Sequence, residues 1–206
     1  MPLLRFFGSR QRFQNPGVLR DGDLELVQPS HEHAPAFLRA VQHPECAADP
    51  ECAITPTALQ AFLEAHPNGL ERPDFRRSRS PAYRFWMQLH EADGLSPPLP
   101  FGGTISLRIG NDENTRLYYG HVGYLVFPPA RGRHYSERAV RLLLPLARRH
   151  GMPELWITTN PDNVPSRRTC ERLGCELVEI IDLPQGHPLW RRGERRKCRY
   201  RLPLST

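Results

Sequence analysis

Residues 120–150 read GHVGYLVFPPARGRHYSERAVRLLLPLARRH, and this stretch decides the fold of the chain. The run from Gly120 to Phe127 has the composition of a strand. It stops at Pro128–Pro129, because a proline cannot donate a hydrogen bond to a sheet ladder. A basic turn, Arg131–His134, then opens an amphipathic helix. The predicted order is therefore strand, basic turn and helix.

The basic turn is suited to binding an anion. The first N–H groups of a helix have no partners within the helix, and the helix dipole is positive at that end. Arg131 and Arg133 bring two full positive charges to the same place. Backbone donors and arginines that converge in this way predict a pocket for phosphate groups.

The same residues resemble a known family, the GNAT superfamily of acyl-CoA-dependent N-acetyltransferases. Its pyrophosphate loop has the form P-x-x-[QR]-x-x-G-x-[GA] and is followed later by an Asn, a short helix and Leu-Gly-Phe. His134 and Ser136 stand where the family has Gly and then Gly or Ala. The positions that correspond to this family pattern occur in the same order and extend over about the last half of the chain. They are Pro128, Arg131, His134, Ser136, Asn163, Ser166 and Leu173-Gly174-Cys175.

The resemblance implies acetyl-CoA as co-substrate and no metal. The pantetheine arm would pair with the backbone at the end of the strand, and the pyrophosphate would lie on the basic turn and the helix start. An Asn and a Ser of the short helix would also contact the cofactor. The implied cofactor-binding residues are Val126, Phe127, Arg131, Gly132, Arg133, His134, Tyr135, Ser136, Asn163 and Ser166.

Three residues are candidates for proton transfer. In the family a Tyr four residues before the Gly of Leu-Gly-Phe often protonates the leaving thiolate, and here Cys170 holds that position. A thiol can donate a proton, although a free cysteine is commonly a small buried residue. His121 can accept the amine proton or serve as a core histidine. Tyr124, on the opposite face of the strand, is an alternative donor or a structural tyrosine.

The function implied is transfer of an acetyl group to a primary amine of an unidentified small molecule or protein, by direct attack in a ternary complex. Two other classes stay open. The absent loop glycines and the absent Tyr are compatible with a non-catalytic sensor of CoA or a nucleotide. A basic stripe, Arg191–Arg201, is compatible with a nucleic-acid-binding module, but two aromatics, Trp190 and Tyr200, are too few for a stacking platform.

Hydrophobic periodicity predicts an α+β fold. The central sheet is expected to be mixed and mostly antiparallel, with flanking helices and a splayed parallel pair formed by 155–159 beside 122–127. This is a GNAT-like arrangement. The other predicted elements are strands at 24–27, 83–90, 104–109 and 118–127, helices at 32–42 and from 57, and a loop at 44–56.

The chain has 206 residues, enough for one medium domain, assigned here to 23–206. Residues 1–22 contain four arginines and no acid before Asp21, and we expect a flexible basic lead-in. The net charge of +6 comes wholly from Arg191–Arg201, which holds seven basic residues and one acid. Its alternation with Cys198, Tyr200 and Leu202 predicts a half-buried edge strand.

The cysteines and the hydropathy suggest the compartment. Five cysteines form an odd set without a CxxC pair, which argues against a disulfide framework and a zinc site. No apolar run approaches the roughly 20 residues that span a membrane. We therefore expect a cytoplasmic protein without a membrane partner. Exposed edge strands of such sheets often pair, which leaves a homodimer open.

Overall fold

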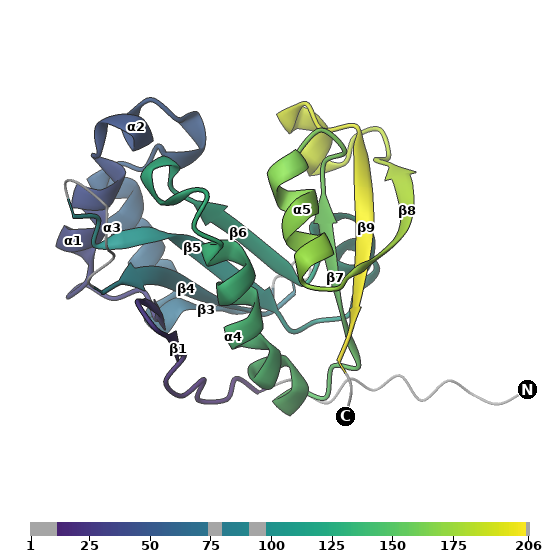
Figure 1. The fold of residues 1–206 in the computed structure, drawn as a ribbon, viewed down its shortest axis with the longest axis horizontal. Coiled ribbons are helices and arrows are strands. Elements are labelled where there is room, and N and C mark those ends of the chain that lie inside the picture. Colours follow the sequence, from purple (N-terminus) through teal and green to yellow (C-terminus); the bar gives the residue numbers. More distant parts are fainter. Residues whose placement is uncertain (1–11, 74–79, 91–97, 205–206) are drawn as a thin grey trace, which may run out of the picture.

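Two sheets stand side by side in the computed structural model, which describes residues 12–73, 80–90 and 98–204 (Figure 1). The first has the order β1-β2-β4-β5-β6 with β3 paired to β4, and every pairing is antiparallel. The second has the order β7-β9-β8. The strands are β1 Arg20–Asp21, β2 Leu24–Val27, β3 Leu70–Glu71, β4 Ala82–Leu89, β5 Phe101–Arg108, β6 Val122–Val126, β7 Glu154–Thr159, β8 Glu176–Asp182 and β9 Arg196–Pro203.

Helices cover both faces of the first sheet, as Figure 1 shows. One face packs against α4, where the Tyr83 hydroxyl lies 2.7 Å from Nε2 of His150. The other face packs against α1 and α3; Phe37 of α1 stacks on Trp86 with ring centroids 4.0 Å apart. The α-helices of the described residues are α1 Ala34–Val41, α2 Pro44–Ala47, α3 Pro56–Ala65, α4 Tyr135–Arg149 and α5 Val164–Arg172.

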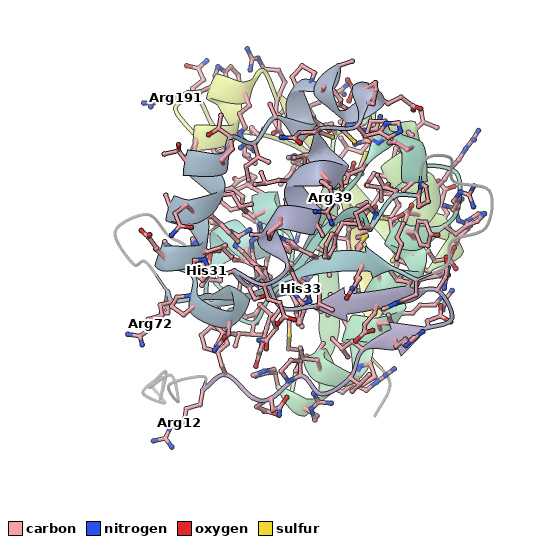
Figure 2. All side chains as sticks on the ribbon, turned by 90° about the vertical axis from the view of Figure 1, so that its left-hand side faces the viewer. Arg12, His31, His33, Arg39, Arg72 and Arg191 are labelled. Atoms are coloured by element: carbon pink, nitrogen blue, oxygen red, sulfur yellow. The ribbon has the colours of Figure 1, made fainter. Side chains whose placement is uncertain are left out.

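Figure 2 looks onto the α1 and α3 side of the molecule. Arg39 lies on α1, and His31 and His33 lie just before this helix (Figure 2). The described helices do not include one with the length and apolar character needed to cross a bilayer.

The α+β prediction is confirmed, because antiparallel strands form the sheets, helices flank them, and α-helices and strands alternate from β6 to β8 as expected. The buried side chains form one apolar cluster that runs from β2 to β9. The predicted strands at 24–27, 83–90, 104–109 and 155–159, and the helices near 32–42 and from 57, are all present with small shifts at their ends.

Hydrogen bonds between His121 and Trp156 join the two sheets. The His121 N–H donates to the Trp156 carbonyl at 2.6 Å, and the Trp156 N–H donates to Nδ1 of His121 at 2.8 Å. From this junction β6 and β7 leave in the same general direction and diverge (Figure 1). The expected splayed pair is therefore present, with each strand belonging to its own sheet.

The strand expected at 118–127 is shorter than predicted and begins at Val122. Thr115–Tyr119 forms a π-helical turn instead. Asp112 holds its start by accepting from the Thr115 N–H at 2.9 Å. Gly120 follows with φ of +69°, and a Cβ there would lie 2.9 Å from the backbone N of Thr158. The close approach of the two sheets thus needs a glycine, and it breaks the strand.

The loop expected at 44–56 contains helical structure. It holds α2 and a 3-10 turn, Pro50–Cys52, and each starts with a proline. Proline suits the first position of a helix because the N–H it lacks would have no partner there. His43 accepts from the Glu45 N–H at 3.3 Å, and Asp49 accepts from the Glu51 N–H at 3.0 Å. The prolines start short helices here rather than an irregular loop.

The prediction that the basic stripe forms an edge strand is wrong. β9 lies between β7 and β8, and β8 is the edge. Arg199 is buried and pairs with Glu179 of β8, and Arg201 pairs with Glu176 at 2.6 Å. Acidic residues on the neighbouring strand thus neutralise arginines that the sequence alone suggests are solvated.

The N-terminal segment is in part packed against the domain. Phe13 lies edge-on to Tyr83 with centroids 5.0 Å apart, and Leu19 is buried. β1 pairs with β2. Residues 1–11 of the predicted lead-in lie outside the described residues, and the domain boundary at residue 23 stays a prediction.

Candidate active site

A cavity of about 790 Å³ lies between the diverging strands β6 and β7. Its walls come from both strands, the basic turn, the first turn of α4 and the inner face of α5. A 3-10 turn at Pro188–Arg192 and the start of β9 also contribute, through Leu189, Arg192, Glu194 and Lys197. The volume falls in the usual range for small-molecule sites.

Arg131 is fixed in place at the edge of this cavity. Its Nε donates to the Val126 carbonyl at 3.1 Å, and its Nη2 lies 2.6 Å from Oδ2 of Asp49. The backbone N–H of Glu51 and the Arg131 guanidinium hold the pKa of Asp49 below its usual range. The basic turn is thus anchored at the end of β6.

His134 adopts the backbone conformation that a glycine would supply. Its φ is +60°, in the left-handed region, and it forms the N-cap of α4. Its side chain is more than half exposed, with Nδ1 3.7 Å from Oε2 of Glu137. Histidine tolerates this region better than most residues, so the turn keeps its shape without the family's glycine. Gly132 also has a positive φ, of +82°.

The first two residues of α4 point in different directions. Tyr135 is buried, and its hydroxyl donates to Oδ2 of Asp23 at 2.5 Å. Burial and the Asp23 carboxylate raise the pKa of Tyr135 to about 12. Ser136 lies with its Oγ 3.1 Å from Oγ1 of Thr169 on α5. This helix start lines the cavity, and its first N–H groups have no partners within the helix, as an anion site requires.

Tyr124 and Ser166 meet across the cavity. The Tyr124 hydroxyl on β6 lies 2.9 Å from Oγ of Ser166 on α5. Burial raises the pKa of Tyr124 to about 12. Asn163 caps α5, accepting from the Ser166 N–H at 3.1 Å. The cavity therefore contains a protonated phenol at neutral pH.

Cys170 and His121 lie outside the cavity lining. Cys170 is fully buried, and a hydrogen bond with Cys175, together with burial, raises its thiol pKa. His121 is buried at the junction of the sheets. Burial, and then the charge of Arg108, lowers its pKa from 6.5 to about 4. Of the three predicted proton-transfer residues, Tyr124 alone lines the cavity within the described part of the chain.

Phe127 is also turned away from the cavity. Its side chain is buried, with its ring centroid 5.7 Å from that of Phe37, and its N–H donates to the Gly102 carbonyl at 2.8 Å. Backbone hydrogen bonds of an antiparallel edge strand alternate between the partner strand and the open side. The N–H groups of Tyr124 and Val126 therefore face the open edge of β6, where Val126 was expected to contribute.

Several residues that line the cavity were not predicted from the sequence to be site residues. Arg108 and Tyr118 come from β5 and the π-helical turn, and Lys197 comes from β9. Lys197 is buried, and its Nζ donates to Oδ1 of Asn160 at 2.8 Å and pairs with Glu194. The position of Arg108 between two apolar residues of an alternating strand is the one signal that marks it in the sequence.

Comparison with known proteins agrees with this geometry. A family profile described as an acetyltransferase (GNAT) domain matches residues 23–176. No curated protein matches the chain in sequence.

Solved structures of low sequence identity share the fold. A putative ribosomal-protein-serine acetyltransferase from Vibrio cholerae is 15% identical with a TM-score of 0.61, covering 92% of this chain and 99% of its own. A putative acetyltransferase from T. thermophilus is 20% identical with a TM-score of 0.60, covering 94% of this chain and 92% of its own. The microcin C7 self immunity acetyltransferase MccE, in complex with acetyl-CoA and AMP, is 15% identical with a TM-score of 0.62, covering 90% of this chain and 94% of its own. The profile spans most of the chain, and the cavity between the two diverging strands is in keeping with it. The protein therefore belongs to the GNAT acetyltransferase family.

Proposed function

We propose that this GNAT enzyme transfers an acetyl group from acetyl-CoA to a primary amine, by direct attack of the amine on the thioester in a ternary complex. The observation that carries the proposal is the Tyr124–Ser166 hydroxyl pair inside the cavity. It lies between the two diverging strands, beyond the anion-binding helix start, where the thioester of a CoA bound at the turn would reach.

The cavity fits an extended anionic thioester. The pyrophosphate would lie on the backbone of residues 131–136, at the start of α4. Arg168 also lines the cavity and adds positive charge on the α5 side, whereas Arg172 in the same wall pairs with Glu137 at 3.0 Å. The pantetheine amides would pair with the open backbone groups of Tyr124 and Val126 on β6. Asn163 supports the site indirectly, because it caps the helix that presents Ser166.

Tyr124 is proposed as the proton donor. When the amine nitrogen bonds to the carbonyl carbon, the carbon–sulfur bond breaks and the thiolate leaves. With a pKa near 12, the phenol stays protonated at neutral pH and donates a hydrogen bond to the departing thiolate. The proton that the attacking nitrogen loses passes through the hydroxyl group to the sulfur, whose own pKa is about 8.5, so the phenol is neutral again when the step ends. Ser166 orients the hydroxyl and can relay the proton from the same position.

His121 and Cys170 are assigned positioning and packing roles. Nδ1 of His121 already accepts a hydrogen bond from the Trp156 N–H, so the ring holds the two sheets together at their junction. The Cys170 thiol pairs with Cys175 beneath α5 and supports the helix that presents Ser166. We place the enzyme in the cytoplasm, because all five of its cysteines are free.

Calorimetric titration with acetyl-CoA, with desulfo-CoA and ATP as comparison ligands, tests the donor site. Micromolar binding is expected, and Arg131→Glu should weaken it by more than tenfold. Arg201→Glu makes the same charge reversal outside the cavity and should stay within twofold of the wild type. Loss of binding in both variants, or in neither, contradicts the assignment of the site.

Turnover is then measured as thiol release across a panel of primary amines. Release that depends on both acetyl-CoA and an amine supports the proposal. Tight binding of acetyl-CoA without release of thiol for any amine contradicts it and favours a non-catalytic sensor.

A further inference from the structure

Arg108 occupies the side of the cavity opposite Tyr124. Residues that pair directly across antiparallel strands share a face, so Ser106 and Arg84 lie on the α3 face, whereas Ile105 and Tyr124 lie on the α4 face. Alternation along β5 places Arg108 with Ser106. The cavity thus has a CoA side, formed by α4 and α5, and a second side on which Arg108 lies.

Gly123 makes room for the Arg108 guanidinium. A Cβ at Gly123 would lie 3.4 Å from Nη1 and 3.6 Å from Nη2 of Arg108. The charged group therefore rests over bare backbone of β6, and any side chain larger than alanine would displace it. Gly123 is the immediate neighbour of Tyr124. The guanidinium thus lies against the residue next to the proposed proton donor. It is on the opposite face of the sheet from Tyr124, the face from which an acceptor would approach.

Arg108 makes no direct ion pair with a carboxylate among the described residues, although the charges of Glu71 and Asp112 act on it from farther away. Its Nη1 donates to the Gly120 carbonyl at 3.1 Å and weakly to the Tyr119 carbonyl at 3.4 Å. Glu71, which lies on the same face, is bonded to Arg84, with Nε of Arg84 3.0 Å from Oε2. Burial, and then the charge of Arg84, lowers the pKa of Arg108.

Arg108 lines the cavity, and its hydrogen bonds to the described residues are made by Nη1. With Nη1 held by backbone carbonyls, Nε and Nη2 are left to offer two parallel N–H groups. This fork matches the two oxygens of a carboxylate or a phosphate. A half-buried cation that makes no direct ion pair carries a desolvation cost, and a bound anion reduces that cost.

We propose that the acceptor amine carries an anionic group, a carboxylate or a phosphate, and that Arg108 binds this group while the amine reaches the thioester beside Tyr124. The inference rests on the proposed acetyl transfer and specifies its acceptor class. Lys197 also lies on this side, but Glu194 already neutralises it. The Arg108 guanidinium is therefore the main recognition group.

Matched acceptor pairs test the inference. Each pair differs only in its anionic group: β-alanine and β-alanine amide, O-phosphoethanolamine and ethanolamine, and the C-terminally amidated dipeptides Ala-Asp-NH2 and Ala-Asn-NH2. The wild type should prefer the anionic member of at least one pair by tenfold or more in kcat/KM. The pair that shows the preference distinguishes a carboxylate from a phosphate.

Arg108→Gln should reduce that preference to within about threefold, while kcat/KM for the neutral member changes much less. Arg201→Gln removes a charge outside the cavity and should keep the full preference. An arginine that only supports the π-helical turn would instead lower both members of a pair equally. That result, or a wild type without any preference, overturns the inference.

A binding measurement separates this inference from the proposed function. Calorimetry of the same amines in the presence of desulfo-CoA reports acceptor binding whether or not turnover occurs. Tighter binding of the anionic member, lost in Arg108→Gln, supports the acceptor class even if no amine is acetylated. If Arg108→Gln does not fold, Gly123→Val displaces the guanidinium and should reduce the preference in the same way. An unchanged preference in that variant also overturns the inference.

Discussion

The Tyr124 hydroxyl lies 2.9 Å from Oγ of Ser166, and this pair joins β6 to α5 across the cavity. Tyr124→Phe should lower kcat about a hundredfold with little change in KM for acetyl-CoA, because the donor acts only as the thiolate leaves. Tyr118→Phe removes a phenol that lines the cavity away from α5 and should change kcat by less than threefold. Equal losses in the two variants would contradict the donor role.

The pH dependence of the wild type provides an independent check on Tyr124. A donor must be protonated to act, and its pKa near 12 keeps it protonated through the accessible range. We therefore expect kcat to stay level between pH 8 and 10 when the amine is saturating. A fall in this range that Tyr124→Phe abolishes would mean that the phenol titrates there, against the proposal.

His134 carries a conformational cost that a glycine would remove. A left-handed residue other than glycine costs roughly 1–2 kcal/mol, partly offset by the extra freedom of glycine in the unfolded chain. His134→Gly should raise the free energy of unfolding by about 1 kcal/mol, or Tm by roughly 2–4 °C. His134→Ala keeps a Cβ at φ +60° and should not raise it. Calorimetric unfolding of both variants decides the point.

Stability should fall in mild acid because of His121. Its pKa is about 4 in the folded protein and 6.5 in the unfolded chain, so below pH 6.5 the unfolded state binds a proton that the folded state does not. Its contribution is complete above that pH and declines as the pH falls toward 4. Between pH 7 and 5 this loss is about 2 kcal/mol. Urea unfolding should show a shallower decline for His121→Gln; identical slopes would exclude His121 as the cause.

Cys170 should be replaceable without loss of chemistry. Cys170→Ala should keep kcat within about threefold, because the thiol is buried against Cys175 and lies outside the cavity lining. The lost packing should lower the free energy of unfolding by about 1–2 kcal/mol. Rapid quench with labelled acetyl-CoA should detect no acetylated enzyme. A covalent intermediate that the variant loses would restore Cys170 as a nucleophile.

Local patterns predicted the parts of the site that are contiguous in the chain. The strand, basic turn and helix order placed the turn at Arg131–His134, and the family resemblance placed a short helix at Asn163 and Ser166. Both depend on backbone hydrogen bonds within a few residues, which spacing can reveal. His134 shows the limit, because its left-handed backbone depends on the whole turn rather than on the residue's own preference.

Non-local contacts account for what the sequence could not show. Arg131 is held by Asp49, eighty-two residues earlier, and no periodicity relates the two. β9 was predicted to be an edge strand, because alternation of polar and apolar residues looks the same in an edge strand and in a central strand. Its central position depends on β8, whose Glu176 and Glu179 pair with its arginines. Cys170 occupies the family's Tyr position, but the phenol proposed as proton donor comes from β6.

The second sheet carries a consequence for how this enzyme can diversify. The family profile ends at residue 176, where β8 begins, yet Leu189, Arg192, Glu194 and Lys197 from the following segment line the cavity. The donor half is built from β6, the basic turn and α4, all before that point. Substitutions at these four positions can therefore vary the acceptor side of the cavity around Arg108, while the residues that bind the thioester stay unchanged.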